Sequence, residues 1–300
     1  MIIAAVILFC AGVIWFADHY RSRSVATKEA LLARLPGKDA LILSIDFAAL
    51  RRAGLMDLLE SSRTPEEPEY KEFVAKTDFD YKEDLDLALA SFAPNGRYFL
   101  LVGRFDWNKL YAYARAEGGT CYNAACQMNG SVPDRKISFA PLRKEIMALV
   151  VSNDSYGASQ LAETPGTPRP VEARPDPVWI SFAGSAIQKS DKLPTGTAIF
   201  AKALADADEV VVSVGPRGED FQANLSVNCR TETDASGLVR ELENDTNLLR
   251  SLIARENRSP NPNDLSGVLT SGTFSARGRQ VSGHWPITKT LVRDTLTGGS

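Results

Sequence analysis

A repeated order of predicted elements, on the two sides of a proline-rich segment, limits the fold of this chain more than any other feature. That segment, ETPGTPRPVEARPDP, runs from 163 to 177 and holds five prolines without an apolar period. Each proline fixes its own φ angle and lacks an amide proton, so residues 164–177 are predicted to form an extended linker. The flanking regions, 40–163 and 178–297, are predicted to be two units of similar length.

Each unit contains a hairpin pattern around a turn with proline second and glycine fourth. In the first unit, strands predicted at 87–92 and 97–102 flank the sequence APNG. In the second unit, strands predicted at 210–214 and 219–227 flank GPRG. Proline presets the dihedral angle of such a turn and glycine relieves it, so both patterns predict a β-hairpin.

Helices and further strands then follow in the same order in both units. One helix is expected from about Asp106, and a longer one from about Asp234, with Thr233 or Asp234 as its N-cap. Second hairpins are expected within 136–151 and 268–287, and each unit ends in a short helix. The shared order β-α-ββ-α-ββ-α predicts an α+β fold with antiparallel hairpins packed against helices. A single continuous α+β domain is the alternative to a duplication.

The first seventeen residues, MIIAAVILFCAGVIWFA, contain no charged side chain. A helix of this length spans roughly 25 Å, which is at the short end of what crosses a bilayer. We therefore expect residues 1–17 to be a transmembrane anchor or signal segment that makes the membrane a partner, with residues 18–39 as a juxtamembrane segment. A cleaved signal peptide and a buried core helix are the alternatives.

Two indications about the side of the membrane oppose each other. Arg21 and Arg23 follow the apolar run and no Lys or Arg precedes it, which taken literally places the body in the cytoplasm. A chain start placed too far downstream would have removed a basic segment before the apolar run. We expect an extracytoplasmic body, either periplasmic or at the cell surface.

Two of the four cysteines lie close together in the glycine-rich sequence GGTCYNAACQMNG. Cys121 and Cys126 can close a small disulfide ring if this loop turns sharply, and two free thiols in a reducing compartment are the alternative. No second cysteine pair and no nearby histidine completes a metal site. Cys229 is expected to be a small core residue at the end of a strand.

We find no pattern that predicts catalysis or cofactor binding. The chain has two histidines, lacks a nucleophile elbow and lacks a phosphate-binding loop. In Ser282-Gly283-His284, neighbouring strand residues point to opposite faces, so no catalytic role is expected for His284. The acidic run 78–86 is the best metal candidate, but Lys82 interrupts the calcium-loop order and a solvated loop with helix-capping acids is expected. A net charge of −3 gives no indication of nucleic-acid binding.

Several stretches support a resemblance to a known group of proteins. The apolar start followed by YRSRS, then LPGKDALILSIDFAALR, DFDYKEDLDLALASF and YFLLVGRFDWNKL, resembles uncharacterised bacterial envelope proteins with a signal-anchor and a duplicated α+β body. The resemblance implies an extracytoplasmic body and supplies no catalytic residues. The missing basic segment before the apolar run departs from the pattern of that group.

These observations favour a membrane-anchored, non-enzymatic envelope module without a cofactor. A ligand or protein partner is expected in a groove between the two halves, because binding sites favour such junctions. One alternative is a hydrolase-type enzyme whose site is assembled between the halves. The other is a structural or assembly component that pairs through an exposed strand or helix face.

Overall fold

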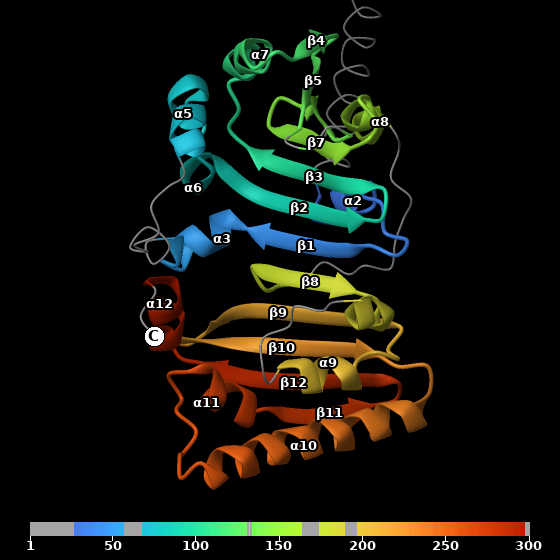
Figure 1. Ribbon diagram of the computed structural model, residues 1–300, viewed down its shortest axis with the longest axis vertical. Coiled ribbons are helices and arrows are strands. Elements are labelled where there is room, and N and C mark those ends of the chain that lie inside the picture. The colour runs from blue at the N-terminus through green and yellow to red at the C-terminus, as the bar shows by residue number, and fades with distance from the viewer. Residues whose placement is uncertain are drawn as a thin grey trace, which may run out of the picture.

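The computed structural model is a mixed α+β structure built on one twelve-stranded sheet (Figure 1). It describes residues 27–56, 68–130, 132, 134–163, 174–189 and 197–297. The strands lie in the order β11-β12-β10-β9-β8-β1-β2-β3-β7-β6-β5-β4, and neighbouring strands are antiparallel. The α+β class with antiparallel strands is therefore confirmed.

The two halves of the chain form the two sides of this sheet. The first half supplies β1 (Leu41–Asp46), β2 (Leu85–Ala93), β3 (Gly96–Gly103), β4 (Thr120–Tyr122), β5 (Ala125–Asn129), β6 (Lys136–Arg143) and β7 (Ile146–Ser152). The second half supplies β8 (Val178–Phe182), β9 (Glu209–Arg217), β10 (Asp220–Asn228), β11 (Thr273–Arg277) and β12 (Gln280–Ile287). Outward from the middle, the orders are β1-β2-β3-β7-β6 and β8-β9-β10-β12-β11.

Strands β1 and β8 join the two halves into one sheet. Ser44 pairs with Trp179 in antiparallel register, and the Asp46 amide donates a hydrogen bond of 2.7 Å to the carbonyl oxygen of Pro177. The two units expected on either side of the linker thus share a sheet instead of forming separate layers. Within the predicted linker, residues 164–173 lie outside the part of the chain that the structure describes.

Alternating side chains divide the sheet into two faces, which we name by their residues. Face A carries Leu149 and Leu225, and face B carries Leu100 and Trp179. The core on face A includes side chains from α3 (Phe47–Arg52), α5 (Pro68–Thr77), α7 (Trp107–Ala116), α9 (Thr197–Ala203), α10 (Glu232–Arg255) and α11 (Leu265–Thr270). The other described helices are α2 (Lys28–Leu32), α6 (Tyr81–Asp84), α8 (Gly157–Glu163), α12 (Lys289–Thr297) and the 3₁₀-helix η1 (Gly184–Lys189).

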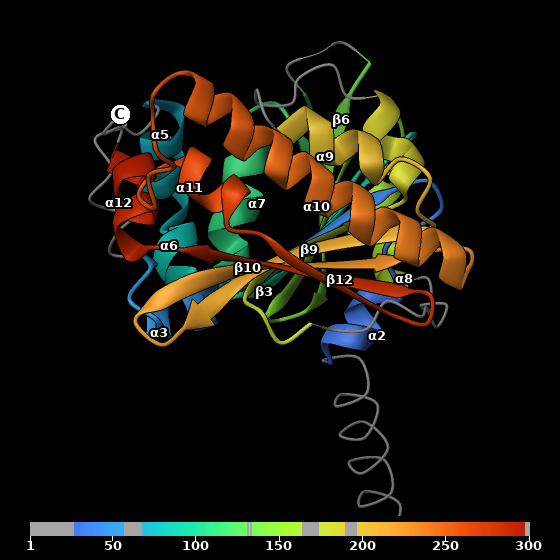
Figure 2. The same cartoon turned by 90° about the horizontal axis from the view of Figure 1, so that it is seen from below.

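Helices α2 and α8 cover face B of the first half. Leu31 and Leu32 of α2 and Leu161 of α8 pack with Leu100 and Trp179 in one buried cluster. Figure 2 shows α2 on one side of the sheet and α9, α10 and α11 on the other. The first half is therefore packed on both faces.

The N-terminal expectations fall partly outside the described residues. Residues 1–17, the expected anchor, are not among them. From Thr27 to Thr297, the described helices include none with the length and apolar character needed to cross a bilayer. The expected juxtamembrane segment 18–39 contains α2, whose leucines belong to the folded core, and Leu35 is also buried there.

The hairpin predicted around GPRG has its turn two residues later than expected. Strand β9 continues through Pro216, which pairs with Phe221, and the turn is formed by Gly218 and Glu219. Gly218 has a φ of 65°. Two-residue hairpin turns favour glycine where φ is positive, because other residues are sterically strained there. Gly218 therefore determines where the chain turns.

Three further expectations are corrected by the structure. Helix α10 begins at Glu232 with Thr231 as its N-cap, and the Thr231 hydroxyl accepts a hydrogen bond of 3.1 Å from the Asp234 amide. The strand expected from 268 begins at Thr273, because Asp264 caps α11 just before it. The glycine-rich loop 118–130 contains the β4–β5 hairpin, which the loop-like composition had hidden.

Candidate functional site: a polar sheet face

Face B of the second half carries rows of polar side chains, in contrast to the apolar face B of the first half. One row runs across β9, β10, β12 and β11 through Ser213, Asn224, His284 and Thr273. The next row holds Val211, Ser226, Ser282 and Ser275, and the one after it Glu209, Asn228, Gln280 and Arg277. Thr273, Ser275, Gln280 and His284 are exposed to solvent. We call these three rows the polar face.

The same register continues into the first half, where the side chains change character. Ser213 is opposite Trp179, which is opposite Ser44, and the row goes on through Leu89 and Leu100. Those two leucines lie beneath α2 and α8 and are fully buried. A packed face therefore becomes a polar face within one continuous sheet.

The described end of the linker contacts the polar face through Asp176. Its carboxylate accepts a hydrogen bond from the Ser213 hydroxyl and one of 3.0 Å from the Asn224 side-chain amide. Asn224 Oδ1 lies 2.9 Å from His284 Nδ1, and Gln222 Nε2 lies 3.1 Å from the same nitrogen. Nδ1 either donates to the Asn224 oxygen or accepts from the Gln222 amide, so the imidazole tautomer decides which bond forms.

The histidine of this face is not paired with a serine hydroxyl. Ser213 donates to the Asp176 carboxylate, and His284 Nδ1 contacts the side-chain amides of Asn224 and Gln222. Ser282 and His284 share a face because they are two residues apart on β12, so the opposite-face argument made from the sequence was wrong. These side chains can both donate and accept hydrogen bonds.

The sequence analysis missed Gln222, Asn224 and Asp176 as functional candidates. A usable signal was present in β10, where Gln222, Asn224, Ser226 and Asn228 alternate with apolar residues. Such a period of two predicts one polar and one apolar face. The contact with Asp176 could not be predicted, because it joins the linker to a strand more than thirty residues away.

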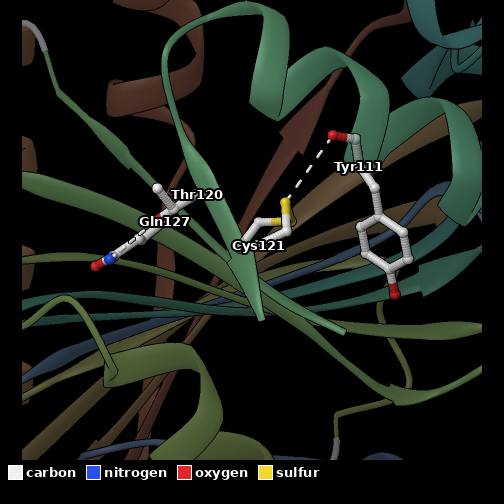
Figure 3. The surroundings of a disulfide bond; sticks show 5 residues. Tyr111, Thr120, Cys121 and Gln127 are labelled. Carbon is white, nitrogen blue, oxygen red and sulfur yellow. Dashed lines mark hydrogen bonds between the residues drawn. A yellow bond between two sulfur atoms is a disulfide. The ribbon is translucent and has the colours of Figure 1, made fainter. Parts of the chain in front are cut away.

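The two cysteines expected to pair lie on the neighbouring strands β4 and β5. Cys121 and Cys126 are directly opposite each other, with 4.0 Å between their Cα atoms, and form a disulfide. Cys121 Sγ lies 3.9 Å from the carbonyl oxygen of Tyr111, and Gln127 Nε2 donates a hydrogen bond of 3.0 Å to the Thr120 hydroxyl (Figure 3). The bond closes the hairpin at one edge of the sheet.

The acidic run 78–86 is engaged in caps and ion pairs. Asp80 caps α6 and accepts a hydrogen bond of 2.8 Å from the Tyr70 hydroxyl. Asp84 pairs with Arg104 at 3.0 Å, and Asp86 pairs with Arg51. Among the described residues, no group of three or more His, Cys, Asp or Glu side chains is arranged so that it could hold a metal ion.

Four cavities lined by described residues each lie within one half of the chain. The cavity between α9 and α10, of about 470 Å³, is lined in part by Cys229, which is 5% exposed as expected for a core residue. Burial raises the pKa of this thiol, and the nearby Asp234 and Asp208 raise it further. The ligand groove expected between the halves is not among these four cavities and stays a prediction.

Comparison with known proteins finds similarity of fold. No protein-family model matches this chain, and no curated protein is similar to it in sequence. Crystal form III of TP0453, a Treponema envelope protein, matches with a TM-score of 0.51 at 8% identity, over 91% of this chain and 99% of that one. Crystal form I matches with a TM-score of 0.48 at 11% identity, over 92% and 100%. At such identities, the match to form III shows a shared fold alone.

Proposed function

We propose that this chain is an envelope protein, held at the membrane by residues 1–17, with an extracytoplasmic, non-enzymatic body that binds a ligand. Three observations support the location. The N-terminal segment is uncharged, the body shares its fold with an envelope protein, and Cys121 is bonded to Cys126. Disulfides persist in oxidising compartments outside the cytoplasm.

The polar face is the observation that carries the binding role. Its exposed side chains are mainly hydroxyls, amides and one imidazole, which both donate and accept hydrogen bonds. A protein partner is usually anchored by aromatic or arginine side chains in apolar pockets. These rows contain no Phe, Tyr or Trp side chain, and their one arginine, Arg277, is exposed. Neutral hydroxyl and acetamido groups match them better. We therefore assign the polar face to a neutral glycan chain of the envelope.

Removal of two exposed side chains from the polar face tests this assignment. The variant Gln280→Ala with His284→Ala should reduce binding of the protein to purified cell-wall glycan about tenfold, measured by co-sedimentation. A matched control is Thr120→Ala with Gln127→Ala, which removes a polar pair from the edge hairpin of the first half. Failure of the unaltered protein to sediment with glycan, or equal losses in both variants, would refute the glycan assignment.

The location is tested separately in intact cells. Protease added outside the cytoplasmic membrane should digest the body, while residues 1–17 keep the remainder in the membrane fraction. A body that is protected until the cytoplasmic membrane is opened would place it in the cytoplasm and overturn the location. That result would leave the glycan assay interpretable, because the assay uses purified protein.

We also propose that the two halves are an internal duplication. The corresponding strand orders on the two sides of β1 and β8 support this origin. Each half also has a helix after its third strand, α7 in the first and α10 in the second. The polar face then represents a divergence between the repeats, because α2 and α8 pack on face B of the first half whereas the core of the second half among the described residues lies on face A.

A further inference from the structure

A basic cavity lies at the end of the sheet where β2 turns into β3, far from the polar face in the strand order. It has a volume of about 460 Å³. Arg97 and Arg135 line it, together with Phe92, Ala93, Pro94, Asn95, Gly96, Val151, Ser152 and Asn153. Its lining thus contains two guanidinium groups and no carboxylate.

Both arginines lack a salt bridge to the described residues, and neither guanidinium forms a hydrogen bond with them. Each is exposed to solvent. The nearest acid in sequence to Asn153 is Asp154, and its carboxylate accepts hydrogen bonds from the Tyr156 amide at 2.8 Å and from Gln160 at 2.9 Å. Two like charges that line one cavity repel each other, so an anion placed between them is attracted by both guanidinium groups and reduces their repulsion.

A second basic cavity, of about 580 Å³, shows why the first is the stronger anion site. Arg174, Arg277 and Arg279 line it, but so do Asp208 and Glu209. These carboxylates offset the positive charge of the second cavity. The Arg97 cavity has no such compensation from its lining residues.

The wall of the Arg97 cavity includes a close contact between β3 and β7. A Cβ at Gly96 would lie 2.8 Å from the Cβ of Ser152, so only glycine allows β3 and β7 to approach this closely. Asn95 and Asn153 add amide donors on either side of this contact. Arg97 lies on β3, and Arg135 comes directly before β6.

We propose that this cavity binds a phosphate group, carried by a soluble phosphate ester or by a lipid headgroup. A guanidinium presents a planar fork that contacts two oxygens of a phosphate at once, and two forks can hold three or four oxygens. The asparagine amides donate to the oxygens that remain. This site is independent of the glycan-binding role assigned to the polar face.

Titration of the full chain in neutral detergent with inorganic phosphate and pyrophosphate, at fixed ionic strength, tests the proposal. We expect saturable binding by calorimetry, with chemical-shift changes at the amides of 94–97 and 151–153. Arg97→Ala with Arg135→Ala should weaken binding at least tenfold. The control with the same change in charge, Arg255→Ala with Arg258→Ala at the exposed end of α10, should stay within about twofold.

A conservative variant separates binding from folding. Arg97→Lys keeps the charge but loses the fork, so its affinity should fall between those of the unaltered protein and the double alanine variant. All variants should keep the melting temperature of the unaltered chain, since the replaced side chains are exposed. The absence of saturable binding, or equal losses in the two double variants, would overturn the proposal.

Two competitors that share a headgroup distinguish the sources of phosphate. Glycerol phosphate and monomeric dihexanoyl phosphatidylglycerol should both displace pyrophosphate. Stronger displacement by the lipid assigns the cavity to a lipid headgroup, and displacement by glycerol phosphate alone assigns it to a soluble ester. Displacement by neither overturns phosphate binding.

Discussion

At the scale of single residues, Asp176 of the linker limits which residue can occupy position 215 on β9, far along the sequence. Its carboxylate is bonded to Ser213 and Asn224 on face B. A Cβ at Gly215 would lie 2.3 Å from Asp176 Oδ1. Because no real contact is this short, residue 215 must be glycine as long as Asp176 occupies its place. Glycine is required here because the Asp176 carboxylate lies so close, and not because of the backbone conformation, since the φ of Gly215 is not positive.

The contact predicts non-additive effects on stability. Gly215→Ala should lower the free energy of unfolding by about 1–3 kcal/mol, because the added methyl group displaces the carboxylate. Asp176→Ala alone should also destabilise the chain, since it leaves the 7%-exposed Ser213 without its acceptor. In the double variant, the added methyl group meets no carboxylate. The loss of unfolding free energy should therefore be smaller than the sum of the losses in the two single variants. Equal costs of Gly215→Ala with and without Asp176, measured by urea unfolding, would contradict the contact.

At the scale of elements, the N-terminus of α10 offers a test with a built-in control. Thr231 and Asp234 form a reciprocal pair of hydrogen bonds, each 3.1 Å, between side chain and backbone. Thr231→Ala should therefore cost about 1 kcal/mol of stability. Thr233→Ala, at one of the two positions that the sequence offered as the cap, should cost less than half of that. Similar losses in the two variants, measured by thermal unfolding, would mean that the helix begins elsewhere.

The same elements explain what the sequence could and could not predict. The helix at Asp106 and the β2–β3 hairpin were predictable, since Asp106 caps α7 and Pro94 is the first residue of a two-residue turn. The β4–β5 hairpin was not, because its turn places Asn123 and Ala124 at positive φ and alanine rarely does so. The strand expected from 268 was displaced by a local cap at Asp264. Caps and turns in the local sequence thus predicted single helices and hairpins. The polar face could not be predicted in this way, because it depends on how residues of different strands pair.

At the scale of the whole molecule, the junction of β1 and β8 decides whether the halves behave as one body. Trp179 belongs to the second half but is 1% exposed within the core of the first, beneath α2. Lys28 Nζ lies 5.7 Å from the centre of its ring, and burial lowers the pKa of this lysine. Ser44 Oγ and Trp179 Nε1 are buried without a hydrogen-bond partner among the described residues, so apolar packing stabilises this junction.

A continuous sheet with a shared core predicts one cooperative unfolding transition. Trp179→Ala should cost about 3–5 kcal/mol, because it leaves a cavity in the core of the first half. Hydrogen exchange of β3 and β10 in urea, one strand from each half, should then show both midpoints falling together. Leu248→Ala, at a position that is 48% exposed on α10, should leave both midpoints in place. If only the midpoint of β3 falls, the two halves are separate folding units that share hydrogen bonds between β1 and β8 without sharing stability.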